Sequence, residues 1–215
     1  MRRTDLLLLV PTRLELEQLK PRLPAWLPVE LCGFGLIASG IRTAGLLADP
    51  SRQDVQRVIL VGMGGSLCGE TWPVGTAGSF GLVRCQGIGA WSGQRLLGPR
   101  ELGFSQCQTA AGDPVTDHLD LLPLDHRSSG AGLLSVAAAS GTTGQAAERA
   151  GRFSGCVCED MEGFAVALAA RQAGCATTVV RGISNVAGDR HRDHWQIEPA
   201  LQAAAQLLLE QLPPR

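Results

Sequence analysis

The sequence predicts an α/β protein, a three-layer α/β/α sandwich with a mixed central sheet. Three observations support this prediction: short apolar runs alternate with helix-length segments, several runs are apolar throughout, and glycine or polar residues follow many of them. Strands that are apolar throughout are typical of sheets with helices on both faces. The 215 residues contain no internal repeat and no linker, so we expect one domain over residues 1–215.

The expected strands begin with LLLLV at residues 6–10, which has no polar face and therefore predicts a strand buried on both sides. The run at 58–62 leads into GMGGSLCG, where the glycines predict a tight turn that lets backbone N–H groups approach a ligand. This glycine spacing does not fit a dinucleotide-binding fingerprint. The other expected strands cover residues 29–33, 78–84, 133–137, 155–158 and 176–181.

Helices are expected between these strands. The leucine spacing over residues 14–23 predicts a first helix that ends before Pro24. Apolar residues at helical spacing predict another helix over residues 161–173, which Gly174 closes. Further helices are expected at residues 38–48, 142–150 and 198–212.

The segment 87–130 differs from the rest of the chain. It is rich in Gly, Pro, Gln and Asp and shows little periodicity. Because it is too long for a plain connection, we expect it to hold turns and a short helix around residues 115–122. Segments of this kind often cover a binding site.

Composition and charge indicate a small-molecule partner. The net charge of −1 provides no basic face for nucleic acid, and no run reaches the roughly 18 apolar residues of a membrane helix. The first residues fit a strand better than a signal peptide. Seven cysteines, an odd number mostly in apolar runs, favour a reducing cytoplasm over a disulfide framework. We expect no metal or other cofactor, because His191 and His194 alone make a weak pair of ligands.

Polar residues near the ends of expected strands are the candidates for chemistry. Glu15 follows the first strand, Glu162 falls in the first turn of the helix at 161–173, and Asn185 follows the last strand. The carboxyl ends of parallel strands share one edge of a sheet, so the three can converge. An ionised Glu162 could accept hydrogen bonds from both vicinal hydroxyls of a ribose. Each acid also has a plain alternative: Glu162 as a partner of the helix dipole, and Glu15 as a solvated helix residue.

Two segments together resemble a known superfamily. EDMEGFAVALAA, followed about twenty residues later by VVRGISNVAGDR, resembles the purine nucleoside phosphorylases and nucleosidases. Within that superfamily, the stretch RGISNVAGDRHRDHWQIEPAL is most similar to the futalosine hydrolases of the menaquinone pathway. The methylthioadenosine/S-adenosylhomocysteine nucleosidases are similar in the first two parts, but they carry an aspartate at the position of Asn185 and lack the DRHRDHW continuation.

The resemblance implies a role for each matching residue. Glu15 matches the glutamate that activates the attacking water, and Asn185 matches the residue that contacts the N7 edge of the purine. The positions matching substrate-binding residues are Met161 and Glu162 for the ribose, Gly65 for the backbone near the ribose and the water, Ser184 for support of the base-contacting side chain, and Phe153 for stacking on the base. The resemblance also implies a homodimer or larger homo-oligomer and no cofactor.

The implied activity is hydrolysis of an N-ribosidic bond, with release of hypoxanthine from futalosine. The amide of Asn185 favours a 6-oxopurine, because one NH2 group can donate to both N7 and O6. Three alternatives stay open. A phosphorylase would need arginines at the anomeric carbon, for which Arg13, Arg42 and Arg84 are available. The others are a nucleosidase that releases adenine and a nucleoside-binding regulatory protein without turnover.

Overall fold

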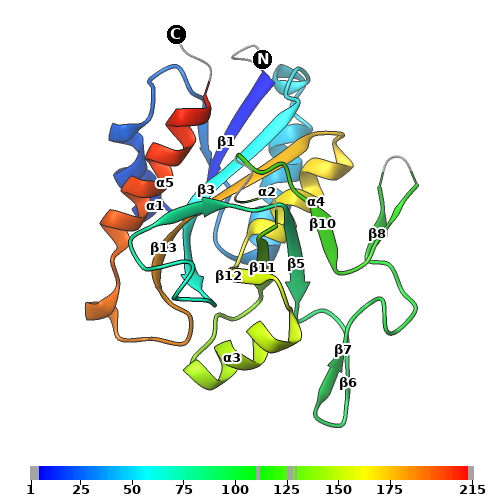
Figure 1. Cartoon of the computed structure of the whole chain (residues 1–215). Coiled ribbons are helices and arrows are strands. Elements are labelled where there is room, and N and C mark those ends of the chain that lie inside the picture. The colour runs from blue at the N-terminus through cyan, green and yellow to red at the C-terminus, as the bar shows by residue number, and fades with distance from the viewer. Residues whose placement is uncertain (1–4, 110–111, 125–127, 129, 213–215) are drawn as a thin grey trace.

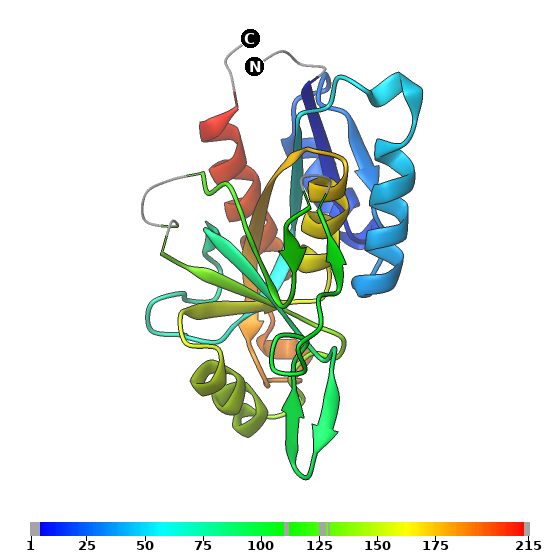
Figure 2. The same cartoon turned by 90° about the vertical axis from the view of Figure 1, so that its right-hand side faces the viewer.

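A computed structural model describes residues 5–109, 112–124, 128 and 130–212. A curled sheet of nine strands runs through the molecule, and helices lie on both of its sides (Figures 1 and 2). The predicted α/β fold with a mixed central sheet is confirmed. The strands that the structure describes are β1 Leu6–Val10, β2 Val29–Leu31, β3 Arg57–Ser66, β4 Ala77–Ser79, β5 Leu82–Gln86, β6 Ala90–Ser92, β7 Arg95–Leu97, β8 Cys107–Gln108, β9 Pro114–Val115, β10 His118–Asp120, β11 Gly132–Val136, β12 Cys156–Asp160 and β13 Ala176–Val186.

The strand order of the large sheet is β10-β5-β11-β12-β3-β1-β2, and β13 pairs with both β3 and β4. Most neighbours are parallel; the pairs β10–β5, β12–β3 and β13–β4 are antiparallel. Strand β3 is the centre of the arrangement, since it pairs with β1, β12 and β13. Gly65 lies in β3, and Ser184 and Asn185 lie beside it in β13, so this pair of strands brings those candidate residues together.

The part of the chain that the structure describes has five α-helices: α1 Arg13–Leu19, α2 Gly35–Leu47, α3 Thr143–Arg152, α4 Gly163–Gln172 and α5 Ile197–Gln211. The two faces of β1 show how the layers form. Leu7 and Leu9 belong to the apolar cluster that includes residues of α2 and α4, whereas Leu6 and Leu8 belong to the cluster with α1 and α5. Successive side chains of a strand point to opposite faces, so an uninterrupted apolar run fills both layers. Figure 2 shows α5 and α2 on opposite sides of the strands.

The expected glycine turn after residue 62 is wrong, because β3 continues to Ser66. Gly62, Gly64 and Gly65 have none of the positive φ angles that a glycine turn requires. Their role is to leave space. A Cβ at Gly62 would lie 2.3 Å from Nη1 of Arg181, and one at Gly64 would lie 2.6 Å from Sγ of Cys158. These contacts are far shorter than any that real Cβ atoms make, so the strand can pass these side chains only as glycine.

Other element boundaries also differ from the predictions. Strand β13 runs on to Val186, so Ser184 and Asn185 lie inside it rather than beyond its end. Helix α4 begins at Gly163, which makes Glu162 its N-cap residue instead of a member of its first turn. The expected strand at 78–84 is split into β4 and β5.

The segment 87–130 forms strands where a short helix was expected: β9 and β10 occupy the region of residues 115–122. The antiparallel hairpin of β6 and β7 projects away from the body of the molecule (Figures 1 and 2). Trp91 near its tip is 71% exposed. Strand β10 extends the large sheet by pairing with β5. Residues 110–111, 125–127 and 129 lie outside the described part.

Candidate active site

Six of the seven residues expected at the site line one pocket of about 190 Å³. The pocket lies where β1, β3, β12 and β13 end, beside the starts of α1, α2 and α4. The parallel strands β1, β3 and β13 have their carboxyl ends at the same edge of the sheet, and the antiparallel pairing of β12 with the end of β3 brings β12 to the same place. The six residues are Glu15, Gly65, Met161, Glu162, Ser184 and Asn185.

Glu15 is held by two different elements. At its own helix start it forms a capping box: Thr12 Oγ1 accepts from the Glu15 N–H, and the Thr12 N–H donates to Glu15 Oε2 at 3.0 Å. The other oxygen, Oε1, accepts from the N–H of Met63 in β3 at 2.9 Å. The residue is only 2% exposed, so it is not the solvated helix acid of the plain alternative. The hydrogen bond from Met63 is not part of a capping box, so the Glu15 carboxylate does more than cap its own helix.

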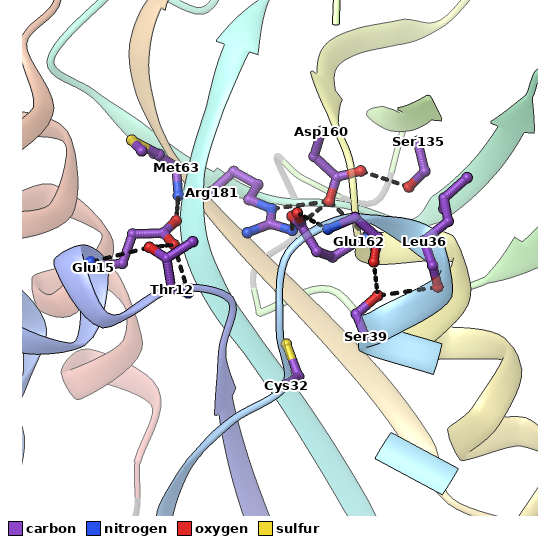
Figure 3. A network of polar contacts seen from close by, with 12 residues as sticks. Thr12, Glu15, Cys32, Leu36, Ser39, Met63, Ser135, Asp160, Glu162 and Arg181 are labelled. Atoms are coloured by element: carbon purple, nitrogen blue, oxygen red, sulfur yellow. Dashed lines mark hydrogen bonds and ion pairs between the residues drawn. The ribbon is translucent and has the colours of Figure 1, made fainter. Parts of the chain in front are cut away.

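Glu162 sits on the other side of the pocket between a helix start and an arginine. Its Oε1 accepts from the N–H of Gly35 at the first residue of α2, at 3.0 Å, and its Oε2 accepts from Nη2 of Arg181 at 3.1 Å. Asp160 binds the same guanidinium through Oδ2, at 3.0 Å from Nε, and with a further contact to Nη2. Figure 3 shows the Arg181 guanidinium between Glu15 on one side and the two other acids on the other.

The environment of Glu162 raises the pKa of its carboxyl group to about 7. Burial is the main cause, because it disfavours the charged form, and the negative charge of Asp160 adds to it. The positive charge of Arg181 and the hydrogen bond from Gly35 act in the opposite direction. Asp160 shares that arginine, so Glu162 receives only part of its charge. A carboxyl with this pKa changes its protonation near neutral pH, which is typical of functional sites.

Arg181 is completely buried, and its Nη1 has no hydrogen-bond partner among the described residues. This nitrogen and Glu15 Oε1 both approach the space over Gly62, at 2.3 and 2.6 Å from the position of a Cβ there. A buried donor without an acceptor costs about 1–3 kcal/mol. Neither Arg181 nor Gly62 is among the residues that line the pocket, so the guanidinium contacts the carboxylate of Glu162 without forming part of the pocket wall.

Asn185 and Ser184 form a connected pair at the end of β13. Ser184 Oγ donates to Asn185 Oδ1 at 2.9 Å. The amide Nδ2 donates to the carbonyl of Val186 at 2.8 Å and, more weakly, to that of Asp189 at 3.4 Å. Both amide hydrogens therefore have main-chain acceptors here. An amide that donates to a purine has to exchange the longer of these two bonds for the base.

The structure does not bring Phe153 into this pocket. Phe153 follows α3, packs against Leu134 and Val136, and lines a separate cavity. The aromatic residues at the pocket are Phe34 and Trp195. Trp195 Nε1 donates to the carbonyl of Asp189 at 3.1 Å, the same oxygen that Asn185 approaches. The Trp195 ring is therefore fixed next to the Asn185 amide.

Sequence reasoning missed Asp160, Arg181 and Trp195. An arginine within the apolar run TTVVRGIS is a signal that could have found the first two, because a buried guanidinium requires carboxylates around it. The tryptophan within DRHRDHW was visible but had no assigned role. His191 and His194 lie in this loop, where His194 Nδ1 is 2.7 Å from Asp189 Oδ2. The described residues contain no group of three or more His, Cys, Asp or Glu side chains that could hold a metal ion.

Comparisons with known proteins identify the family of this chain. A family model for the Phosphorylase superfamily matches residues 134–211. A futalosine hydrolase from Streptomyces coelicolor is 30% identical over 186 residues, which cover 80% of this chain and 75% of that protein. A second futalosine hydrolase, from Acidothermus cellulolyticus, is 31% identical over 160 residues and covers 71% and 62% of the two chains. The chain belongs to the futalosine hydrolase family.

Solved structures share the fold over nearly the whole chain. The native structure of a futalosine hydrolase from Helicobacter pylori superposes with a TM-score of 0.73 at 15% identity and covers 96% of both chains. A methylthioadenosine/S-adenosylhomocysteine nucleosidase from Colwellia psychrerythraea, in complex with adenine, gives a TM-score of 0.72 at 18% identity and covers 96% and 93%. No helix within the described residues has the length and apolar character needed to cross a membrane.

Proposed function

We propose that this member of the family hydrolyses the N-ribosidic bond of futalosine and releases hypoxanthine, with Glu15, Glu162 and Asn185 as its principal site residues. The observation that carries the proposal is the convergence of two buried carboxylates and an amide on one pocket. Hydrolysis of a nucleoside requires three groups of this kind: an acceptor for the sugar hydroxyls, a base for the attacking water, and a donor to the departing purine.

The attack begins with a water at the anomeric carbon of the ribose. In a dissociative mechanism the C–N bond breaks with both electrons passing to the purine, which leaves a cation-like ribose. The water oxygen then forms a bond to the anomeric carbon as Glu15 takes a proton from it, and the purine takes up a proton, so that hypoxanthine leaves neutral. Arg181 does not line the pocket; its contribution is to hold the carboxylate of Glu162, to which Nη2 donates at 3.1 Å. General-base assistance of this kind contributes roughly 10²–10⁴-fold to the rate.

The purine leaves with developing negative charge, which Asn185 stabilises. Its NH2 group can donate to N7 after releasing the 3.4 Å bond to the Asp189 carbonyl. Ser184 Oγ donates to the amide oxygen of Asn185, and this hydrogen bond fixes the orientation of the amide, so that the NH2 group and not the oxygen is available to the purine. A donor placed where charge develops is worth more in the transition state than in the ground state. Trp195 provides the flat apolar surface for the base, in the role that the resemblance gave to Phe153.

Glu162 binds the ribose, while Met161 and the backbone of Gly65 shape the pocket around it. Its carboxylate already accepts from Gly35 and Arg181, and each oxygen has a further lone pair for a hydroxyl. The pocket of about 190 Å³ is smaller than those of typical drug-sized ligands, which are about 300–1,000 Å³. The arm of futalosine beyond the ribose therefore extends outward past Phe34. None of the described residues of 87–130 lines this pocket.

Phosphorolysis has little support, because it needs two or more arginines at the anomeric carbon. Among the described residues, Arg190 is the one arginine that lines the pocket, and none of the three named for this reaction does. Arg42 is 3.6 Å from Glu30, Arg84 lines a different cavity, and Arg13 is exposed on α1. A base-release assay with futalosine, inosine and methylthioadenosine, each with and without phosphate, tests the proposal. We expect phosphate-independent release of hypoxanthine from futalosine. Release only with phosphate, or release of adenine in preference to hypoxanthine, would contradict it.

A homodimer completes the proposal. Phe34, Ile37 and Ile41 are 64–80% exposed at helical spacing along one face of α2, directly beside the pocket. Trp91 and Phe104, in the segment 87–130, are also exposed to about 70%. A second copy that covers the α2 face removes Phe34, Ile37 and Ile41 from water and closes the pocket. Light scattering on the purified protein and on Ile37→Glu tests this, with the variant expected as a monomer of lower activity.

Since all seven cysteines are free, we further propose a reducing cytoplasm as the location of the protein.

A further inference from the structure

A second cavity of about 410 Å³ shares no lining residue with the active-site pocket. Its walls come from the end of β5, the hairpin strand β7, the turn at residues 98–101 and the C-terminal end of α3. These elements meet on the side of the molecule where the β6–β7 hairpin projects (Figure 1). The proposed nucleosidase reaction does not use any of these residues.

Arginines dominate the charged groups of this cavity. Arg84, Arg95, Arg100 and Arg152 line it, against only two acids, Glu101 and Asp117, so the positive charges exceed the negative ones by two. Glu101 pairs with Arg95 and lies 3.9 Å from Arg152. In the described part of the chain, the side chains of Arg84 and Arg100 form no ion pair and no hydrogen bond.

Arg84 is the most informative of the four. It belongs to β5, an interior strand of the large sheet with β10 and β11 on its two sides, and its side chain is only partly exposed. Asp117 is the nearest acid: burial acts to raise the pKa of its carboxyl, but hydrogen bonds from His118 and Thr116, and the charge of Arg84, hold that pKa below its ordinary value. Asp117 is thus ionised, and the excess of positive charge remains after it is counted.

Two further groups define the chemistry of the cavity. Burial raises the pKa of the Cys85 thiol to about 12, so it stays neutral and adds no negative charge. Gln86 Oε1 is buried without a hydrogen-bond partner in the described residues, which leaves an acceptor for a hydroxyl or amine of a ligand. The ring of Phe153 offers an apolar wall. The lining therefore combines cations, one free acceptor and one aromatic surface.

We propose that this cavity is a binding site for a small metabolite that carries a dianionic oxyanion group, best matched by a phosphate monoester. Guanidinium groups match phosphate geometry through paired N–H donors, and a phosphate ester carries close to two negative charges at neutral pH. The charge of such a group equals the excess of positive charge in the cavity. The volume of 410 Å³ leaves room for a sugar or nucleoside body next to Phe153 and Gln86.

The test is calorimetric titration of the intact protein at fixed ionic strength with phenyl phosphate, inorganic phosphate, succinate and acetate. We expect saturable binding of phenyl phosphate that saturating hypoxanthine does not displace. Affinity falls as the pH is lowered through about 6, where the phosphate loses its second charge. Arg84→Gln and Arg100→Ala should each weaken binding at least about tenfold. Arg100 is exposed, so its replacement does not threaten folding.

Arg171→Ala is the matched control, because it removes one exposed arginine from α4, outside both cavities, and should leave the affinity unchanged. Absence of saturable binding overturns the proposal, as does equal weakening by Arg171→Ala or displacement by hypoxanthine. Tighter binding of succinate than of phenyl phosphate overturns the assignment of a phosphate group. None of these outcomes depends on whether futalosine is the substrate of the active site.

Discussion

Arg181 lies directly opposite Gly62 in the parallel ladder between β13 and β3, and its guanidinium occupies the space where a side chain at Gly62 would stand. Arg181 thereby lies between Glu162 and Glu15, the two candidate carboxylates of the site. On one side Arg181 binds Asp160 and Glu162, and on the other it faces Glu15 across the glycine. Because Gly62 has no side chain, Arg181 can lie between Glu15 and Glu162.

Gly62→Ala should therefore inactivate the enzyme. The new methyl group would meet Nη1 of Arg181 at 2.3 Å and Oε1 of Glu15 at 2.6 Å, so one of these groups must move. Displacement of a catalytic group by about 1 Å costs roughly 100-fold in rate. The measurement is kcat for hypoxanthine release. Gly151→Ala is the control: it lies in α3, does not line the pocket, has no atom within 4 Å of the new Cβ, and should raise stability by about 0.5–1 kcal/mol with normal kcat. Normal kcat in Gly62→Ala would show that the position of Arg181 is not critical.

Glu15→Gln should bind futalosine and hardly turn it over. The amide keeps the size of the carboxylate and an oxygen for the Met63 N–H, but it cannot take a proton from water. We expect kcat to fall roughly 10²–10⁴-fold with little change in the Kd of futalosine. Stopped-flow measurement of binding and a steady-state assay of base release separate the two quantities. An unchanged kcat in Glu15→Gln would remove Glu15 from the role of base.

The raised pKa of Glu162 predicts a pH dependence of activity. The ionised carboxylate accepts hydrogen bonds from the ribose hydroxyls, whereas the protonated form has one oxygen fewer for them. Because the pKa is about 7 in the free enzyme, kcat/KM for the wild type should rise with pH up to about 7 and then level off. Glu162→Gln should lower kcat/KM by about 100-fold or more and abolish this limb, since hydrogen bonds to charged groups are each worth about 1.5–3 kcal/mol. A limb that persists in the variant would belong to another group.

The same group affects stability with the opposite trend. Its folded pKa of about 7 lies above the ordinary value of 4.5, so the folded protein binds the proton more tightly than the unfolded chain. The stabilisation is complete below pH 4.5 and is lost as the pH rises to about 7, by roughly 3 kcal/mol at most. Urea unfolding of the wild type and of Glu162→Gln between about pH 5 and 8 should give curves that differ in this slope. Parallel curves would mean that the pKa is not raised.

Asn185→Asp should change the preferred leaving base. A protonated aspartic acid can donate to N7 and accept from a 6-amino group, while the amide suits the 6-oxo group. A buried polar group that faces the wrong edge costs about 1–3 kcal/mol, so the ratio of hypoxanthine to adenine release should fall about tenfold or more. Parallel assays with futalosine and an analogue that carries adenine in place of hypoxanthine measure this ratio. Ser184→Ala is a useful companion, since it frees the amide oxygen and should lower the rate without reversing the preference.

Local patterns were sufficient to predict most of the fold. The run LLLLV predicted β1 within its observed bounds, because a strand buried on both faces has an unmistakable composition. The glycines from Gly62 onward were misread because their reason is non-local: Arg181 and Cys158, far along the chain, cross over the strand there. The buried acids were found, but the arginine that joins them was not. Its place within an apolar run indicates that it is buried, but no local pattern shows which carboxylates lie around it.

The position of Phe153, the residue predicted to stack on the purine, is the clearest remaining difference between the sequence prediction and the structure. Phe153 packs behind α3, whereas Trp195 lines the pocket and is fixed by its hydrogen bond to the Asp189 carbonyl. Trp195→Ala should raise the KM for futalosine by about 5- to 100-fold, because stacking of a base on an aromatic ring is worth about 1–3 kcal/mol. Phe153→Ala should instead lower stability by about 0.5–3 kcal/mol and leave KM near the wild-type value. Steady-state kinetics and thermal unfolding of both variants distinguish the two, and a larger rise of KM in Phe153→Ala than in Trp195→Ala would restore the original assignment.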